Sequence, residues 1–494
     1  MTLPRLDSLA KLNGAARSPG YVPSNHKAGI VHLGIGAFHR AHQAVMTDDA
    51  LAAHGGDWRI VGVSLRSRAL AEILNAQNGL FTLIERGAEG HHARVIGAVE
   101  RLIAADSEAA LAALCDPAIC IVTLTVTEKG YGIDRATGLP DTASAVVAAD
   151  IKSPETPSSV LGLLVAALRQ RREKKAAPLT LLSCDNLPEN GRLLRSGVVG
   201  FARMIGENDL ANWIDTHIAF PSSMVDRITP ASTDKTLADA KALTGCEDHA
   251  AVETEPFIQW VIEDNFVSGR PHWEAGGALF VPDVTPYERM KLTILNGTHS
   301  MLAYSGFLSG CKYVRDVMSD RDLSVLVRRH LKAAAALLPP LDGVDFGAYI
   351  SDLTDRFANP AIAHETYQIA TDGTQKLSQR IFQPAIQAID RELDVRPFAF
   401  AAAMWMRFCL PRRDDGDTYE LRDPRAGELI ETLADVEPKA SDILNAIHSL
   451  PQLVPERLVR EPTWTSAIEE VLAKSLREGC RAAVAFEVSR TLNT

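Results

Sequence analysis

The sequence predicts an α/β N-terminal domain followed by a mostly α-helical C-terminal domain. Short apolar runs that suit strands alternate with helical segments in the first part of the 494-residue chain, as in a sheet covered by helices. Beyond residue 290 the pattern is mainly helical. We expect the boundary near Pro282–Pro286, which gives domains of residues 1–284 and 285–494, each long enough for its own core.

Apolar runs followed by glycine or polar residues predict the strands of the first domain. The run at residues 118–126 is nearly continuous and β-branched, which is typical of a strand buried on both faces of a parallel sheet. The other expected strands are residues 29–33, 58–65 and 178–184. Helices are expected over residues 160–172, 323–338, 398–410, 467–476 and 479–486, and helices and loops over residues 192–280.

Gly34 and Gly36 follow the first strand with G-x-G spacing. Such glycines permit a tight turn and a close approach of the backbone to a pyrophosphate, which the helix start at Ala37 and Phe38 would favour. The third glycine of the usual fingerprint is missing, and His39 lies near its place. We expect a dinucleotide site here; the alternative is an ordinary turn.

The end of the second strand bears on the choice of cofactor. An acidic residue there would bind the ribose 2′-hydroxyl of NAD. The chain instead continues as Leu65-Arg66-Ser67-Arg68, with no acid before Glu72. Arg66 and its neighbours could accept the 2′-phosphate of NADP, so this segment favours NADP or the use of both cofactors; the alternative is an exposed helix start.

Polar residues follow the next two expected strands, where ligands of open α/β sheets bind. Glu128 and Lys129 come after the third strand, and Asp185 and Asn186 after the fourth. The amide of Asn186 could donate a hydrogen bond to a developing alkoxide. Both segments also fit ordinary exposed turns.

Lys291, Asn296 and His299 place an amine, a carboxamide and an imidazole in an otherwise apolar region. The run Leu292–Cys311 has twenty residues without Asp, Glu, Lys or Arg, but its amide, imidazole and hydroxyls favour a buried helix over a membrane span. On a regular α-helix Asn296 and His299 share a face, and Lys291 lies about 140° from Asn296. A buried lysine with a lowered pKa is a candidate general base; the alternative is a snorkelling lysine beside a core histidine.

The segment Ala370–Arg380 is polar and contains Gly373, Lys376 and Arg380. We expect an exposed loop, or a loop that folds over a substrate.

The composition excludes several classes of function. The net charge of −11 argues against nucleic acid or an anionic membrane as partner. Seven cysteines are scattered without a CxxC pair, which predicts reduced thiols in a cytoplasmic protein and gives no zinc signature. Residues 1–29 contain no apolar signal-peptide segment. The sequence does not determine the oligomeric state, and a monomer is compatible with it.

With these pieces in place, the chain resembles the polyol-specific long-chain dehydrogenases, the group of mannitol dehydrogenases and fructuronate reductases. The matching words span almost the whole chain: IVHLGIGAFHRAHQA, LTVTEKGY, SCDNLPENG, MVDRITP, EPFIQWVIEDNFVSGRP, MKLTILNGTHS and DGTQK. The resemblance implies a Rossmann-like N-terminal domain, a mostly helical C-terminal domain, and metal-independent hydride transfer with NAD(P).

The resemblance also implies roles for individual residues. Lys291 would be the general base for alcohol oxidation and, protonated, the acid for ketone reduction. Asn186 and Asn296 would hold the reacting oxygen, and His299 would orient the substrate. Asp226 and Lys376 match positions on the substrate side of the site. Against the local arginine signal, the resemblance favours NAD over NADP.

Two details favour a sugar acid, specifically D-fructuronate interconverted with D-mannonate. Lys129 stands where mannitol dehydrogenases tend to have glycine, and Gln368 stands where they tend to carry arginine. A carboxylate requires a fixed cation, and Lys129, Lys376 and Arg380 are the candidates. The alternatives are a mannitol 2-dehydrogenase acting on D-mannitol and D-fructose, and a nucleotide-binding sensor without catalysis.

Overall fold

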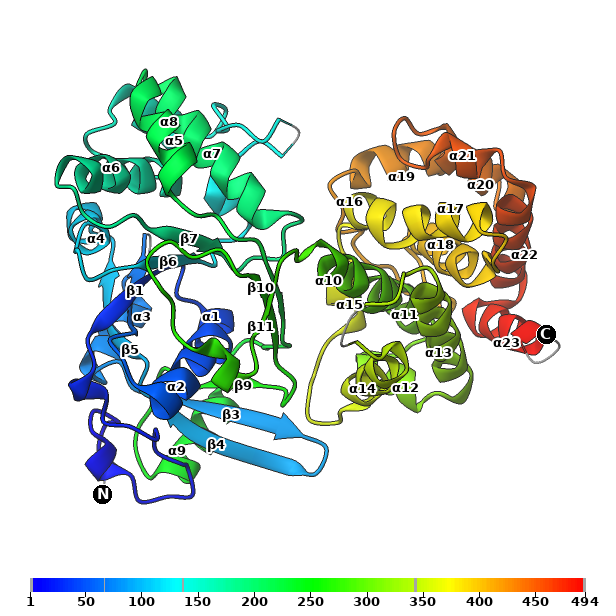
Figure 1. Cartoon of the computed structure of the whole chain (residues 1–494). Helices are drawn as coiled ribbons and strands as arrows, with labels where there is room; N and C mark the ends of the chain where they lie inside the picture. The colour runs from blue at the N-terminus through cyan, green and yellow to red at the C-terminus, as the bar shows by residue number, and fades with distance from the viewer. Residues whose placement is uncertain (1–2, 66, 136, 342–343, 492–494) are drawn as a thin grey trace. The chain divides into compact units, whose positions relative to one another are not determined.

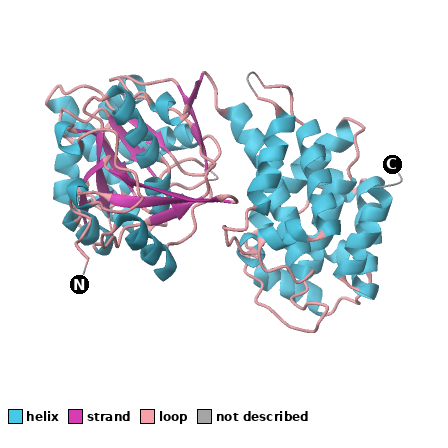
Figure 2. Cartoon of the chain, turned by 90° about the horizontal axis from the view of Figure 1, so that it is seen from below, coloured by secondary structure: helices cyan, strands magenta, loops and turns pink. Residues whose placement is uncertain are grey.

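The computed structural model describes residues 3–65, 67–135, 137–341 and 344–491. The chain divides into two compact units, Met1–Thr285 and Pro286–Thr494 (Figure 1). Figure 2 shows that the strands lie in the first unit, whereas helices build the second. Arg66 lies outside the described residues, so its predicted role is not addressed by the structure.

A five-stranded parallel sheet is the centre of the first unit, with the strand order β5-β2-β1-β6-β7. Val31 of β1 pairs with Val61 of β2 on one side and with Val122 of β6 on the other. The strands are β1 (Ala28–Leu33), β2 (Arg59–Ser64), β5 (Val99–Ala104), β6 (Ile121–Leu124) and β7 (Thr180–Ser183). Their carboxyl ends share one edge, and the order reverses beside β1, where open α/β sheets bind ligands.

Both faces of this sheet are buried, as the apolar runs predict. Val31 and Val61 belong to one core and the neighbouring Ile30 and Ile60 to another, because successive side chains point to opposite faces. The helices of this unit are α1 (Ala37–Ala41), α2 (Gln43–His54), α3 (Ala69–Ala76), α4 (Ser107–Leu114), α5 (Ala145–Lys152), α6 (Val160–Glu173), α7 (Asn190–Met204), α8 (Asn208–His217) and α9 (Asp234–Thr244). Short 3₁₀ turns occur at Leu9–Lys11, Pro23–Asn25, Glu128–Tyr131 and Trp273–Gly276.

Two small sheets complete the unit. One has the order β11-β10-β8 and the other β4-β3-β9. Their strands are β3 (Phe81–Gly87), β4 (Gly90–Ile96), β8 (Ser223–Asp226), β9 (Val252–Thr254), β10 (Gln259–Glu263) and β11 (Leu279–Val281). The expectation of only helices and loops over residues 192–280 is therefore wrong, because four short strands lie there.

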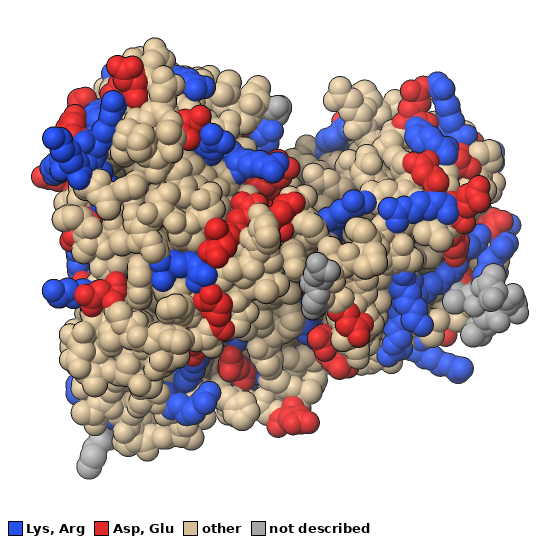
Figure 3. All heavy atoms as spheres, viewed as in Figure 1, with Lys and Arg blue, Asp and Glu red and all other residues tan. Residues whose placement is uncertain are grey.

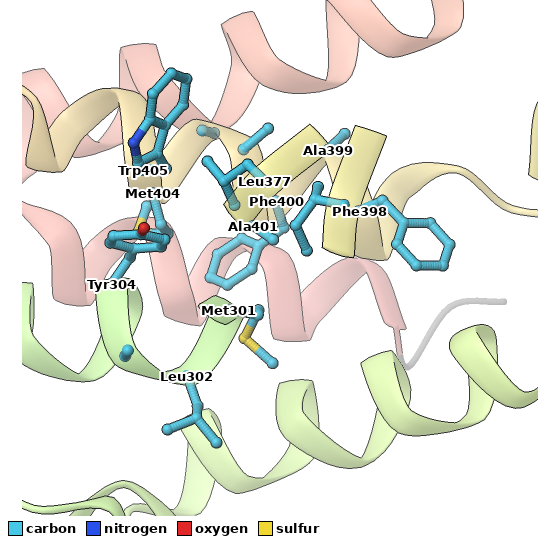
Figure 4. Packing of buried hydrophobic residues seen from close by; sticks show 14 of the residues in the cluster. Met301, Leu302, Tyr304, Leu377, Phe398, Ala399, Phe400, Ala401, Met404 and Trp405 are labelled. Carbon is cyan, nitrogen blue, oxygen red and sulfur yellow. The ribbon is translucent and has the colours of Figure 1, made fainter. Parts of the chain in front are cut away.

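The second unit packs around α11 (Gly297–Leu308), which is buried along its whole length. Figure 4 shows Tyr304 of α11 lying against Met404 and Trp405 of α18. The unit contains α10 (Thr285–Met290), α11, α12 (Val314–Ser319), α13 (Arg321–Ala336), α14 (Phe346–Ala358), α15 (Thr366–Ile369), α16 (Gly373–Leu377), α17 (Gln383–Asp390), α18 (Arg396–Phe408), α19 (Ala426–Ala434), α20 (Ala440–Ser449), α21 (Glu456–Val459), α22 (Pro462–Glu478) and α23 (Cys480–Thr491).

Two π-helical turns interrupt the helices of this unit. The first, here called the lysine π turn, is η5 (Lys291–Asn296), and it continues directly into α11. The second, the arginine π turn, is η6 (Ser378–Phe382), and it follows α16. The expectation of a regular α-helix at Lys291 is therefore wrong, because an extra residue widens the turn there.

The expectation that Ala370–Arg380 forms a loop is also wrong. After Asp372 the chain forms α16 and then the arginine π turn. The backbone N–H of Thr374 donates to Asp423 over 2.8 Å. A Cβ on Gly373 would lie 2.7 Å from the Tyr304 hydroxyl, so this part of the segment packs tightly on the core, while Gln375, Ser378 and Gln379 are exposed.

No helix among the described residues is both long and apolar enough to cross a membrane. On the face shown in Figure 3, basic and acidic side chains are interspersed over each unit. That face therefore presents no continuous basic surface of the kind that nucleic acid binds.

Replacement of Glu487 with alanine is expected to destabilise the second unit. Glu487 of α23 is fully buried between Arg329 of α13, at 2.7 Å, and Arg396 of α18, at 3.0 Å. Its removal takes the shared counter-charge from two cations, which keep Asp394 and Glu470 as their other partners, and costs about 1.5–3 kcal/mol in urea unfolding. Glu456→Ala is the control, because its pair with Arg460 is exposed and should matter little. Equal stability of the two variants would contradict the expectation.

Candidate active site

The glycine turn after β1 is fixed by backbone geometry. Gly34 has a φ of +93°, and a Cβ there would collide with the carbonyl oxygen of Thr125. The N–H of Gly34 donates to Val63 over 2.9 Å, and that of Gly36 donates to Gly34 over 2.8 Å. Around the position of a Gly36 Cβ, by contrast, the nearest atom is the Gly34 oxygen at 3.9 Å. Gly34 is thus required by the fold, whereas Gly36 leaves room for a ligand.

A buried histidine, His32, is linked to the glycine turn through hydrogen bonds. His32 Nδ1 and Nε2 lie 2.8 and 2.9 Å from the hydroxyls of Thr123 and Thr125, and Thr125 donates to the carbonyl oxygen of Gly34 over 2.7 Å. Burial lowers the pKa of His32 to about 3, and its ring stacks on His39 at 3.5 Å. His32 is therefore a neutral bridge between β1, β6 and the turn.

A cavity of about 580 Å³ lies at the carboxyl edge of the sheet in the first unit. Its wall includes Gly34 and Gly36 after β1, Ser64 and Ser67 at the end of β2, and Lys129 after β6. This size and lining fit a nucleotide, with the glycine turn beside the phosphates. Ala37 and Phe38 open α1 next to this wall.

Asp185 fastens the segment that carries Lys129. Its carboxylate accepts hydrogen bonds from the N–H of Val126 over 2.9 Å and from the hydroxyl of Tyr131 over 2.8 Å. Tyr131 is buried, and burial followed by the charge of Asp185 raises the pKa of its phenol well above its usual range. Lys129 itself is exposed on the 3₁₀ turn, and the side chain of Glu128 lies outside the described residues.

Asn186 follows a strand of one sheet, and Asp226 ends a strand of another. Asn186 is exposed in the turn after β7, and Asp226 is the buried last residue of β8. Asn190 links the two strands, because its amide donates to Ser223 over 2.7 Å and to Asp185 over 3.0 Å. Through Asn190, the turn after β7 is joined to the strand that carries Asp226.

The lysine π turn changes the arrangement of the residues predicted in the second unit. Lys291, only 7% exposed, is its first residue, and Asn296 is its last. Hydrogen bonds in a π turn join residues five apart, so these two side chains lie one turn from each other instead of 140° apart. His299 follows on the first turn of α11.

His299 is buried and neutral. Its ring packs 4.7 Å from Phe357 and 5.5 Å from His364. Burial lowers its pKa well below the ordinary value, and the positive charges of Arg356, Arg380 and Lys291 lower it further. Its buried Nε2 has no hydrogen-bond partner among the residues that the structure describes, so it is available to a ligand oxygen.

Lys376 and Arg380 differ in their surroundings. Lys376 Nζ donates to the carbonyl oxygen of Thr371 over 2.8 Å and pairs with Asp372 at 3.3 Å. Burial, then the charge of Arg380, lowers its pKa. The guanidinium of Arg380 has a single side-chain hydrogen bond within the described parts of the chain, from Nη1 to the Ser300 hydroxyl over 3.3 Å. Burial lowers the pKa of Arg380 as well, and the charges of Tyr304 and Asp372 partly oppose this effect.

The predicted residues thus form two groups, one in each unit. Gly34, Gly36 and Lys129 line one cavity, and Asn186 follows the neighbouring strand. The second group belongs to the second unit and consists of Lys291, Asn296, His299 and Arg380. The positive charges of Lys291 and Arg380 both lower the pKa of His299. Tyr131 and Ser300 have no role predicted from the sequence, and their hydrogen bonds to Asp185 and Arg380 are seen only in the three-dimensional structure. Within the described residues, no group of three His, Cys, Asp or Glu side chains could hold a metal ion.

Comparison with known proteins decides the family. The mannitol dehydrogenase Rossmann domain matches residues 28–275, and the mannitol dehydrogenase C-terminal domain matches residues 283–461. The chain belongs to the mannitol dehydrogenase family. This confirms the family predicted from the sequence words and the predicted combination of a Rossmann domain with a helical domain.

Individual relatives cover almost the whole chain. It is 43% identical over 471 residues to the uncharacterized oxidoreductase YeiQ of Escherichia coli (strain K12), covering 94% of this chain and 96% of that one. It is 38% identical over 476 residues to the D-mannonate oxidoreductase of the same organism, covering 94% and 97%. It is also 38% identical over 449 residues to the polyol:NADP oxidoreductase of Gluconobacter oxydans (strain 621H), covering 89% and 91%.

A solved structure extends the comparison to three dimensions. The mannitol 2-dehydrogenase of Pseudomonas fluorescens, in a ternary complex with NAD and D-mannitol, is 34% identical and has a TM-score of 0.84, with all of both chains covered. The chain is accordingly an oxidoreductase of a family whose members act on polyols and sugar acids.

Substitution of the two turn glycines is expected to separate folding from cofactor binding. Gly36→Ala should keep the melting temperature but weaken NADH binding about tenfold or more, because its methyl group takes the space of the phosphates. Gly34→Ala should lower the melting temperature, because it strains a positive φ and collides with Thr125. Fluorescence titration with NADH and thermal unfolding measure the two effects. Wild-type NADH affinity in Gly36→Ala would exclude the glycine turn as the phosphate site.

Proposed function

We propose that the protein interconverts D-fructuronate and D-mannonate, with NAD as the hydride carrier. The observation that carries the proposal is the Arg380 guanidinium, which is half-buried, lowers the pKa of His299 through its charge, and is hydrogen-bonded only to the Ser300 hydroxyl among the described side chains. A neutral polyol offers such a cation no counter-charge, whereas a sugar acid does.

The energetics of Arg380 support a carboxylate ligand. A guanidinium removed from water is costly unless it is paired and hydrogen-bonded. Its planar fork matches a carboxylate through two parallel hydrogen bonds. Lys376 is less suited to this role, because Asp372 and Thr371 already satisfy its amine. Lys129, exposed on its turn, is proposed as a further contact to the sugar acid.

The proposed reaction assigns one task to each polar residue. Bound NADH supplies the hydride to the carbonyl carbon of the substrate. The Lys291 ammonium gives a proton to the carbonyl oxygen during reduction, and the neutral amine takes it back during oxidation. Asn186 and Asn296 donate hydrogen bonds that stabilise the charge developing on that oxygen.

The remaining polar residues orient the substrate in this proposal. His299 is neutral, so its Nε2 makes one hydrogen bond to the substrate without adding charge. Asp226 is proposed to accept a hydrogen bond from a substrate hydroxyl, and Lys376 to bind on the substrate side.

The choice of NAD rests on the similar mannitol 2-dehydrogenase, whose ternary complex contains NAD. NADP is the alternative. The cavity wall at the end of β2 contains Ser64 and Ser67, which could bind a 2′-phosphate, and one relative is a polyol:NADP oxidoreductase. Reduction rates with NADH and NADPH at equal concentration discriminate between them.

A second candidate function is that of a mannitol 2-dehydrogenase, which the same structural similarity favours. It differs from the first in requiring no cation for the substrate. A sensor without catalysis would show cofactor binding but no turnover on any aldonate or polyol.

Replacement of Arg380 with methionine should discriminate between these functions. We expect the KM for D-fructuronate to rise about 10- to 100-fold, as for loss of a charged hydrogen-bonding group, and the KM for D-fructose to change little. Arg413→Met is the matched control, because Arg413 is also a half-buried arginine of this unit but stacks on Phe307. Wild-type preference for fructose, with no effect of Arg380→Met on fructuronate, would exclude the sugar-acid function.

Replacement of Lys291 with methionine should abolish the proton transfer while preserving the fold and cofactor affinity. We expect kcat to fall at least 100-fold, the lower part of the range for general acid–base catalysis, with an unchanged NADH dissociation constant. Single-turnover absorbance at the nicotinamide band measures the chemical step. The exposed Lys332→Met is the control. A rate close to that of the wild type in Lys291→Met would remove Lys291 from the mechanism.

A further inference from the structure

The two π turns of the second unit lie against each other, and Gly297 is the residue at the contact. A Cβ added to Gly297 would lie 2.8 Å from the carbonyl oxygen of Arg380, and 3.5 Å from the ring of His330. Real Cβ atoms essentially never come so close to backbone, so any side chain at Gly297 would push the two turns apart. The carbonyl group of Arg380 cannot move alone, because it belongs to the helical backbone between α16 and α17.

Each turn carries one of the two chemical functions of the proposed site. The lysine π turn begins with Lys291 and ends with Asn296, the residues assigned to the reacting oxygen. The arginine π turn carries Arg380, the residue assigned to the carboxylate. Gly297 directly follows Asn296, so the contact joins the two functions through a short and rigid path.

A side-chain hydrogen bond spans the same contact. Arg380 Nη1 donates to the hydroxyl of Ser300, which is buried one turn beyond Asn296 on α11. The backbone of Arg380 is thus located by Gly297, and its guanidinium by Ser300. Gly297 and Ser300 therefore fix where the Arg380 guanidinium lies, and neither residue contacts the reacting atoms in the proposed mechanism.

We infer that Gly297 and Ser300 are positioning residues that set the separation between the Lys291–Asn296 pair and the Arg380 guanidinium, so that the site selects sugar acids by the spacing of carbonyl and carboxylate. The inference rests on the proposed function. A neutral ketose occupies only the reacting end and is insensitive to this separation. A ketose acid must place its carbonyl at Lys291 and its carboxylate at Arg380 at the same time. A movement of either π turn relative to the other therefore weakens the binding of the ketose acid more than that of the ketose.

The test compares Gly297→Ala with Gly306→Ala. Both glycines lie on α11, and a Cβ at Gly306 would collide with the Val317 side chain, away from the π turns. We expect kcat/KM for D-fructuronate to fall about 10- to 100-fold in Gly297→Ala, as for a misplaced substrate, while kcat/KM for D-fructose falls much less. In Gly306→Ala the two values should fall together or stay unchanged, because its effect is confined to packing.

Ser300→Ala provides a second, independent variant should Gly297→Ala fail to fold. Its control is Ser305→Ala, a buried serine of the same helix that bonds the Met301 carbonyl oxygen over 2.8 Å. We expect Ser300→Ala to raise the KM for D-fructuronate several-fold and to leave both its kcat and the KM for D-fructose near the wild-type values. The Ser305→Ala variant should show no substrate-dependent change.

The outcomes separate the inference from the proposed function. If the wild type prefers fructuronate and Arg380→Met loses that preference, the function stands. An unchanged fructuronate-to-fructose ratio in Gly297→Ala and Ser300→Ala would then overturn the positioning role alone. A wild type that reduces fructose but not fructuronate would overturn both.

Discussion

The half-buried guanidinium of Arg380 is the constraint on which the proposed chemistry of the C-terminal unit depends. A permanent positive charge that is partly removed from water requires hydrogen-bond acceptors, and among the described side chains only the Ser300 hydroxyl accepts a hydrogen bond from it, while the charge of Asp372 acts without a direct ion pair. The same region contains Lys291 and the neutral His299, so its field favours an anion. These features are the basis for proposing a sugar acid as the substrate.

The N-terminal unit follows from a different constraint, the shared edge of a parallel sheet. Every loop that follows β1, β2, β6 or β7 arrives at this edge, which is why short polar words after apolar runs could be predicted as site residues from the sequence. The predicted strands agree with β1, β2, β6 and β7 to within a few residues. The strand β5 and the small sheets were not predicted, because β3, β4 and β10 mix charged with apolar residues and lack a clean alternation.

The π turns were beyond what the sequence could predict. An α-helix and a π turn share the same run of apolar residues, and the difference of one residue per turn is set by packing against neighbouring helices. The same holds for Asp185 with Tyr131, and for Arg380 with Ser300, whose partners lie tens of residues away in the chain. Motif words predict which residues react, whereas the contacts around these residues become visible only in the three-dimensional structure.

The lysine π turn has a consequence for how this chain can vary. Because hydrogen bonds in a π turn join residues five apart, Lys291 and Asn296 lie one turn from each other only while the segment keeps its π geometry. Relaxation of the same six residues to an ordinary α-helix would place the two side chains about 140° apart. A change of an apolar residue such as Leu292 or Ile294 that allowed this relaxation would therefore separate the amine from the amide without replacing either of them.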